Sequence, residues 1–301
     1  MIFSALAGNE GARFETESGW KGYTQISPGY FSNVVSISFS AFDPFNPPKE
    51  QRDPTKGVCY YYIGLKHHAT DGSANLKNVD KLYEEFAVSL GICLSEKGKR
   101  QRWLKTISTL ESDDNFAEME LAKLADLSSG NLFEKASELK KQISSGHAIV
   151  LLTLTKLISC LEEKTLVLFD EPECHLHPPL LSALIRSLSE LLYDRNAVAI
   201  LATHSPVVLQ EIPSSCVWNI MRSGSVGSSI RPDNQTFGEN VGSLTRDVFG
   251  LEVSKSGFNS LLSQEAEKGS TYEHALESFS GQLGFEGRAI LRSLINLRDK
   301  Q

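Results

Sequence analysis

An acidic pair directly follows an apolar run in the middle of the chain. Residues 166–169 are all apolar, and Asp170 and Glu171 come next. A buried parallel strand is a continuous apolar run, and ligands of parallel α/β sheets bind at the carboxyl ends of the strands. There, Asp170 can hold Mg²⁺ through its water shell, while Glu171 polarises an attacking water. An isolated Asp-Glu pair is more often an ordinary acidic strand-to-helix turn, so the prediction depends on the motifs that accompany the pair.

A histidine follows the next apolar run. Residues 197–202 predict a second strand, which leads into Thr203, His204, Ser205 and Pro206. An imidazole at the edge of a sheet can donate a hydrogen bond to a phosphate and orient a water molecule. A single histidine is more often a core or helix-entry residue. In combination with the acidic pair, His204 is predicted to sense a phosphate group.

A third group of small residues precedes a helical pattern. Ser144, Ser145 and Gly146 lie just before the apolar run 148–152. A turn of this kind presents backbone N–H groups, a serine hydroxyl and the positive end of the helix dipole together. These groups can bind an anionic phosphate. The alternative is that Ser144 or Ser145 simply caps the helix.

The elements that must position these residues alternate in type. The predicted core consists of helix 147–161, strand 165–169, helix 180–193 and strand 197–202. This order predicts an α/β fold with a parallel sheet. Two further strands, 33–42 and 58–65, are predicted to pair with each other. After Pro213, strand 217–221 and helices near 259–267, 272–280 and 287–297 are expected.

Four segments follow from this pattern. Residues 1–66 carry the N-terminal strands, 67–142 form a polar helical insertion, 143–232 form the core, and 233–301 form a helical C-terminal appendage. Within the insertion, residues 79–90 and 115–127 have amphipathic helical patterns.

The three motifs in this order, over residues 143–213, resemble the ABC-type ATPases of the overcoming-lysogenization-defect (OLD-like) group. The resemblance implies an ABC-type P-loop NTPase head that uses ATP and Mg²⁺. It matches Asp170 and Glu171 with the Walker B pair, and His204 with the switch histidine. It also places Ser145 and Gly146 in the signature motif, which contacts the γ-phosphate of ATP held by an opposing subunit.

The same resemblance extends to the segment after Glu173. The run Cys174, His175, Leu176, His177 and Pro178 takes the place of the D-loop, which in this family faces the partner's site. His177 is therefore expected near bound nucleotide. A metal site on Cys174, His175 and His177 is the less favoured alternative, because no second ligand cluster accompanies them.

A complete head of this family also needs the phosphate-binding loop G-x-x-x-x-G-K-[ST]. The sequence lacks it, because Gly98-Lys99 is its only Gly-Lys pair and Arg100 follows. This predicts a fragment of a longer reading frame, or a chain that works beside another polypeptide. Either way, this chain would be the C-terminal part of the head.

The resemblance also implies partners. A second ATPase head is expected, in a homodimer or larger assembly, and a separate nuclease subunit in bacterial antiviral defence, as in Septu-type or retron-linked systems. After Pro213, the segment from Asp233 to Gln301 is too short for a nuclease module and has no carboxylate cluster typical of a two-metal nuclease, so this chain is not expected to cut nucleic acid itself. Two alternatives stay open: a non-hydrolysing module that completes a partner's ATP site, and a DNA-repair ATPase that resembles the RecF group.

Composition limits the other function classes. The formal net charge is -7 and the pI is about 5.6, so any nucleic acid would have to meet a local basic patch. Such a patch is formed by Lys97, Lys99, Arg100 and Arg102 around Trp103, although a solvated helix face is the alternative. Five cysteines without a C-x-x-C pair, and the lack of a signal or membrane pattern, predict a cytoplasmic protein.

Overall fold

The computed structural model describes residues 29–41, 46–67, 76–127, 129–223, 226–254 and 257–300. The chain divides into two compact units, Met1–Val208 and Leu209–Gln301. Each unit has an apolar core of its own. The proposed functional residues all belong to the first unit.

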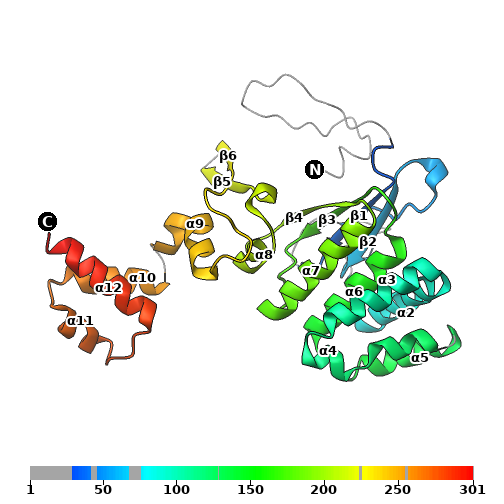
Figure 1. The fold of residues 1–301 in the computed structure, drawn as a ribbon, viewed down its shortest axis with the longest axis horizontal. Helices are drawn as coiled ribbons and strands as arrows, with labels where there is room; N and C mark the ends of the chain where they lie inside the picture. The colour runs from blue at the N-terminus through cyan, green and yellow to red at the C-terminus, as the bar shows by residue number, and fades with distance from the viewer. Residues whose placement is uncertain are drawn as a thin grey trace, which may run out of the picture. The chain divides into compact units, whose positions relative to one another are not determined.

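A four-stranded sheet of order β2-β1-β3-β4 lies at the centre of the first unit (Figure 1). All three neighbouring pairs are parallel, which confirms the predicted α/β class. The strands are β1 (Asn33–Ser38), β2 (Cys59–Gly64), β3 (Thr165–Asp170) and β4 (Val198–Ala202). The first strand ends earlier than predicted, and Phe42 lies outside the described residues.

Helices make up most of the rest of this unit. They are α2 (Val79–Ser95), α3 (Lys97–Leu110), α4 (Asp114–Glu118), α5 (Ser129–Leu139), α6 (Ser145–Cys160), α7 (Pro178–Asp194) and α8 (Pro206–Gln210). The single helical pattern predicted for residues 115–127 is instead α4 followed by a 3-10 helix, Leu121–Asp126, because Glu120 between them has a left-handed backbone (φ 47°). None of the helices described is long and apolar enough to cross a membrane.

The alternation of side chains along the strands creates two apolar faces. Val35, Ile37, Val167 and Phe169 join the large core, to which α2, α3, α6 and α7 contribute. Figure 1 shows these helices gathered beside the sheet. On the other face Val34, Tyr60, Tyr62 and Leu166 form a smaller cluster. The described helices therefore pack on one face, whereas the strand side chains on the other face pack against one another.

Trp103 joins the insertion to the core and is not a stacking surface. Its side chain is 0% exposed, and its Nε1 donates a hydrogen bond to Oγ1 of Thr155, 3.0 Å away on α6. The stacking alternative for Trp103 is therefore wrong. The aromatic ring supplies apolar area to the core, and its only polar atom finds a partner there.

Three of the four cations proposed for nucleic-acid binding take part in ion pairs. Lys99 is buried and pairs with Glu96 and Glu162 at 3.2 Å, Arg100 pairs with Asp126 at 3.3 Å, and Arg102 pairs with Asp194 at 2.8 Å. These partners neutralise much of the positive charge that the sequence places around Trp103. The surface is thus closer to the solvated, ion-paired helix face than to a basic patch.

The described residues of the second unit form a two-stranded antiparallel hairpin, a short 3-10 helix (Ser214–Cys216) and several α-helices. The strands and α-helices are β5 (Asn219–Ser223), β6 (Val226–Ile230), α9 (Val241–Ser254), α10 (Gly257–Glu267), α11 (Tyr272–Ser278) and α12 (Phe285–Arg298). Helices α10, α11 and α12 match the three predicted patterns. The sequence analysis missed β6, because its residues are mostly small and polar, and it missed α9 as well. Leu262, Ala275 and Leu291 lie at the centre of the core formed by α10, α11 and α12.

We expect Trp103→Ala to lower the free energy of unfolding by about 3–5 kcal/mol, because it removes a fully buried aromatic side chain. Trp103→Phe should cost less, about 1–3 kcal/mol, since it keeps most of the apolar area but leaves the Thr155 hydroxyl without its donor. Urea unfolding followed by circular dichroism measures both. Unchanged stability in Trp103→Ala would contradict the buried position.

Candidate functional site

The carboxyl ends of β3 and β4 bring the acidic pair and the histidine to one edge of the sheet. Asp170, the last residue of β3, pairs in register with Ala202, the last residue of β4. The next backbone N–H, that of Glu171, donates to the carbonyl oxygen of Ala202 at 2.9 Å. His204 follows two residues later and is exposed. The two strands are thus adjacent and parallel, as the predicted arrangement requires.

Glu171 has a backbone conformation that is uncommon for its residue type. Its φ is 47°, in the left-handed region, which costs a residue with a Cβ about 1–2 kcal/mol. The turn is closed by the N–H of Cys174, which donates to the Glu171 carbonyl at 3.0 Å. Strain of this kind persists where the surrounding structure enforces it, and it gathers at functional sites.

The Glu171 carboxylate also contacts Cys174. The thiol of Cys174 donates to Oε2 of Glu171 at 3.3 Å. Burial, followed by the hydrogen bond and negative charge of Glu171, raises the pKa of the Cys174 thiol to about 11. Cys174 is therefore a neutral donor to the carboxylate at neutral pH.

Glu173 connects the two strand ends, and the sequence analysis gave it no role. Its Oε2 accepts a hydrogen bond from Oγ1 of Thr203, and its Oε1 accepts from the backbone N–H of His204, both at 2.7 Å. The carboxylate therefore positions the backbone of His204 relative to the loop after β3. The available signal was a glutamate just beyond the acidic pair together with a threonine just before the histidine.

The signature turn, Ser144 to Gly146, lies against the same loop. Ser144 is the N-cap of α6, and its hydroxyl accepts from the N–H of His147, so the capping alternative holds for this residue. Ser145 is exposed. Gly146 is buried, and a Cβ added there would lie 2.9 Å from the carbonyl oxygen of His175. Only glycine permits this close approach of the two backbones.

His177 has a capping role of its own. It is the N-cap of α7, and its Nδ1 accepts from the N–H of Leu180 at 3.4 Å. Pro178 occupies the first turn of the helix, where a missing N–H costs nothing. The imidazole is exposed, and its centroid lies 5.8 Å from that of His147. His177 therefore lies close to His147 in the first turn of α6, next to the signature turn.

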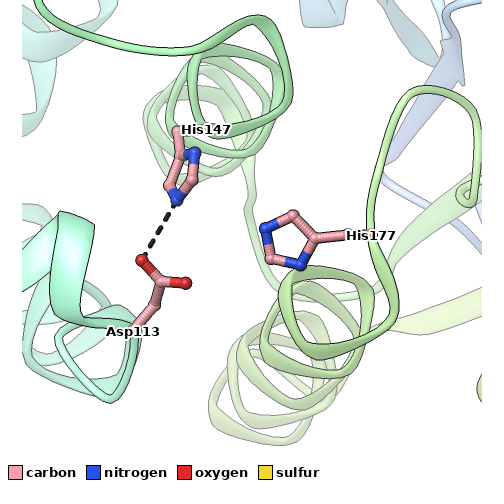
Figure 2. A group of neighbouring side chains, drawn as sticks. All are labelled: Asp113, His147 and His177. Atoms are coloured by element: carbon pink, nitrogen blue, oxygen red, sulfur yellow. Dashed lines mark hydrogen bonds and ion pairs between the residues drawn. The ribbon is translucent and has the colours of Figure 1, made fainter.

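A buried histidine that the sequence analysis did not single out links the insertion to this region (Figure 2). Nε2 of His147 lies 3.0 Å from Oδ1 of Asp113, and its Nδ1 lies 2.6 Å from the Ser144 hydroxyl. Burial opposes ionisation of Asp113, but the hydrogen bonds from His147 and from backbone N–H groups outweigh it and lower the pKa of Asp113. Nothing in the local sequence pairs Asp113 with His147, because they belong to different segments.

The site residues differ in what they can hold. Asp170 offers carboxylate oxygens at the exposed edge of the sheet, and such hard oxygen ligands suit Mg²⁺. The exposed Ser145 and the backbone at the start of α6 suit a phosphate. The sequence contains no G-x-x-x-x-G-K-[ST] loop, so none of these groups supplies the backbone amides and lysine that hold the β- and γ-phosphates in P-loop proteins.

Comparison with known proteins supports the class of fold. A family model described as "AAA domain, putative AbiEii toxin, Type IV TA system" matches residues 112–210, a range that contains all of the site residues discussed above. An AAA domain is a nucleotide-binding ATPase domain of the P-loop type, and the parallel sheet with its flanking helices agrees with that class.

One relative is similar over most of the chain. "Protein ea59" of Escherichia phage lambda is 49% identical over 294 residues, which cover 92% of this chain and 55% of the relative. The chain thus spans about half the length of this relative. Its name specifies no activity, so the match supports common descent without adding a reaction or a partner.

We expect Gly146→Ala to lower the free energy of unfolding by about 1–3 kcal/mol, because the new methyl group must push the signature turn away from the His175 carbonyl. Gly91→Ala in α2 is the matched control. Its Cβ would meet only Leu132 at 4.0 Å, so better helix propensity should stabilise it by up to about 1 kcal/mol. Thermal and urea unfolding of both variants, compared with the parent, test this difference in sign.

Cys174 should react slowly with iodoacetamide at pH 8, because its raised pKa leaves little thiolate. Removing the negative charge of its neighbour in Glu171→Gln should lower this pKa and speed the reaction. Mass spectrometry of the labelled peptides measures both rates, with the exposed Cys216 as the internal standard. Equal Cys174 rates in the parent and the variant would contradict the Glu171 contact.

Proposed function

We propose that this chain is the catalytic-carboxylate part of an ABC-type ATPase head that binds Mg-ATP and hydrolyses it. The observation that carries the proposal is the adjacent, parallel arrangement of β3 and β4, which delivers Asp170, Glu171 and His204 to one edge of the sheet. The family match to an AAA domain over the same residues supports it.

In this proposal each residue has a distinct role. Asp170 holds Mg²⁺ through its water shell, and the ion would neutralise charge on the phosphates. Glu171 accepts a proton from the attacking water, and its strained turn fixes the direction of the carboxylate. His204 orients the water and the γ-phosphate, while Glu173 keeps the His204 backbone in place.

The phosphate-binding loop would come from another segment. Among the described residues, β4 is an edge strand of the sheet, with β3 on one side and no strand on the other. Its residues Val198 and Ile200 are 52% and 47% exposed. An open strand edge with exposed apolar side chains can pair with a further strand. We place the strand that carries the missing loop at this edge, next to His204, whether it belongs to a longer form of this protein or to another polypeptide.

A second ATPase head would face the signature turn of this chain, so that each ATP lies between two heads. Ser145 and Gly146, with the exposed start of α6, would contact the γ-phosphate bound by an opposing head, and His177 would lie at the same interface. Hydrolysis would then open the dimer. A partner nuclease and a role in antiviral defence rest on the OLD-like resemblance alone.

The second candidate function is a non-hydrolysing module that lends its signature turn to a partner's ATP. The lack of the phosphate-binding loop favours it for this chain alone. Both functions predict weak Mg-ATP binding by the isolated chain. They differ once a polypeptide with the phosphate-binding loop is added, because turnover appears only if Asp170, Glu171 and His204 act as an ATPase site. A RecF-like repair ATPase would in addition respond to DNA.

Glu171→Gln in the assembled protein should lower ATP turnover by about 100-fold or more, because the amide cannot accept the proton of the attacking water. The ATP-bound dimer should then accumulate, as light scattering after size-exclusion chromatography would detect. The exposed Glu163, just before β3, gives a matched control, and Glu163→Gln should retain turnover. If Glu171→Gln keeps the parent's rate, the ATPase assignment fails.

A further inference from the structure

Three side chains from separate elements converge where the insertion meets the core (Figure 2). Asp113 is the N-cap of α4, His147 lies in the first turn of α6, and His177 is the N-cap of α7. Each offers one ligand atom, and these atoms all lie within 4.8 Å of one another. Two imidazoles and one carboxylate are a common ligand set for zinc and related divalent metals. We propose that Asp113, His147 and His177 bind a divalent transition-metal ion, with Zn²⁺ preferred.

His147 and Asp113 already have the arrangement that such an ion needs. The 3.0 Å between Nε2 of His147 and Oδ1 of Asp113 is close to the separation of two ligands on one metal ion. Nδ1 of His147 lies 2.6 Å from the Ser144 hydroxyl, and a hydrogen bond on the second ring nitrogen is what orients most metal-binding histidines. His147 is only 5% exposed, so packing holds its ring in place. The ion would replace the proton that His147 and Asp113 share.

His177 closes the site from the solvent side. Figure 2 shows its ring facing the other two residues, with one ring nitrogen toward them. Nδ1 serves the 3.4 Å contact with the Leu180 N–H, so Nε2 is the nitrogen for a metal. If Nε2 binds the metal, the proton of the neutral ring lies on Nδ1, which can then no longer accept the Leu180 N–H. Bonding to the ion would then hold the ring in place of that long hydrogen bond. Because His177 is exposed, water can reach the ion and fill a fourth position.

This site is distinct from the magnesium position proposed at Asp170 and does not depend on the ATPase assignment. Mg²⁺ prefers oxygen ligands and octahedral geometry, whereas two imidazoles favour zinc, copper, nickel or iron. A bound ion would tie α4 of the insertion to the first turns of α6 and α7. It would thereby fix the signature turn relative to the loop after β3, because Ser144 and Gly146 lie in that turn.

Metal binding by the tag-free, chelator-treated chain tests the proposal directly. After dialysis against micromolar ZnCl₂, the parent should retain one zinc ion per chain, and Co²⁺ in its place should give visible absorption bands typical of nitrogen and oxygen ligands. Asp113→Asn and His177→Ser both keep a side chain that can cap a helix. Each should weaken zinc binding by more than about ten-fold, because each removes a ligand.

A matched control lies in the same loop. His175 has a left-handed backbone (φ 65°), which asparagine tolerates, so His175→Asn should fold and retain its zinc. Millimolar MgCl₂ should not displace the zinc ion. Equal zinc content in the parent, Asp113→Asn and His177→Ser would overturn the proposal, and so would a folded parent that retains no zinc. Neither result would affect the Glu171→Gln test, which uses Mg-ATP.

Discussion

The parallel pairing of β3 with β4 is the constraint on which the candidate site depends. The two strands end together at Asp170 and Ala202, and the bond from the Glu171 N–H to the Ala202 carbonyl extends their ladder by one residue. Burial of Val167 and Phe169 against the helices fixes the register, because a slip by one residue would turn these side chains to the opposite face. Packing of the buried strand residues therefore sets the relative positions of the acidic pair and His204.

The loop after β3 connects the ends of β3 and β4 to the signature turn through direct contacts. It has left-handed backbones at Glu171 and His175, and the Glu173 carboxylate bonds to Thr203 and to the backbone of His204. At its far end the His175 carbonyl lies against Gly146. One short segment thus contacts both groups of residues proposed to meet nucleotide. Several bonds and a close backbone contact over-determine its conformation, which explains how the strained backbone is maintained.

The helical insertion is part of the core of the first unit. Trp103 on α3 is buried and bonds to Thr155 on α6, and the half-buried Asp113, the N-cap of α4, bonds to the buried His147 of α6. Helix α6 also begins at the signature turn. A change in how the insertion packs would therefore reach the first turn of α6 directly, which gives this insertion a physical route to the site.

The sequence by itself determined the four strands of the parallel sheet and the helices α6 and α7, since apolar runs and their spacing report burial on a sheet. It also predicted that Asp170, Glu171 and His204 lie at the carboxyl ends of neighbouring strands, because polar residues after buried strands emerge at that edge of the sheet. Only the tertiary structure decided the partners of Glu173, the meeting of Asp113 with His147 and His177, and the burial of Trp103. These depend on contacts between segments far apart in the chain, and local residue pattern carries no information about which distant surface a side chain will meet.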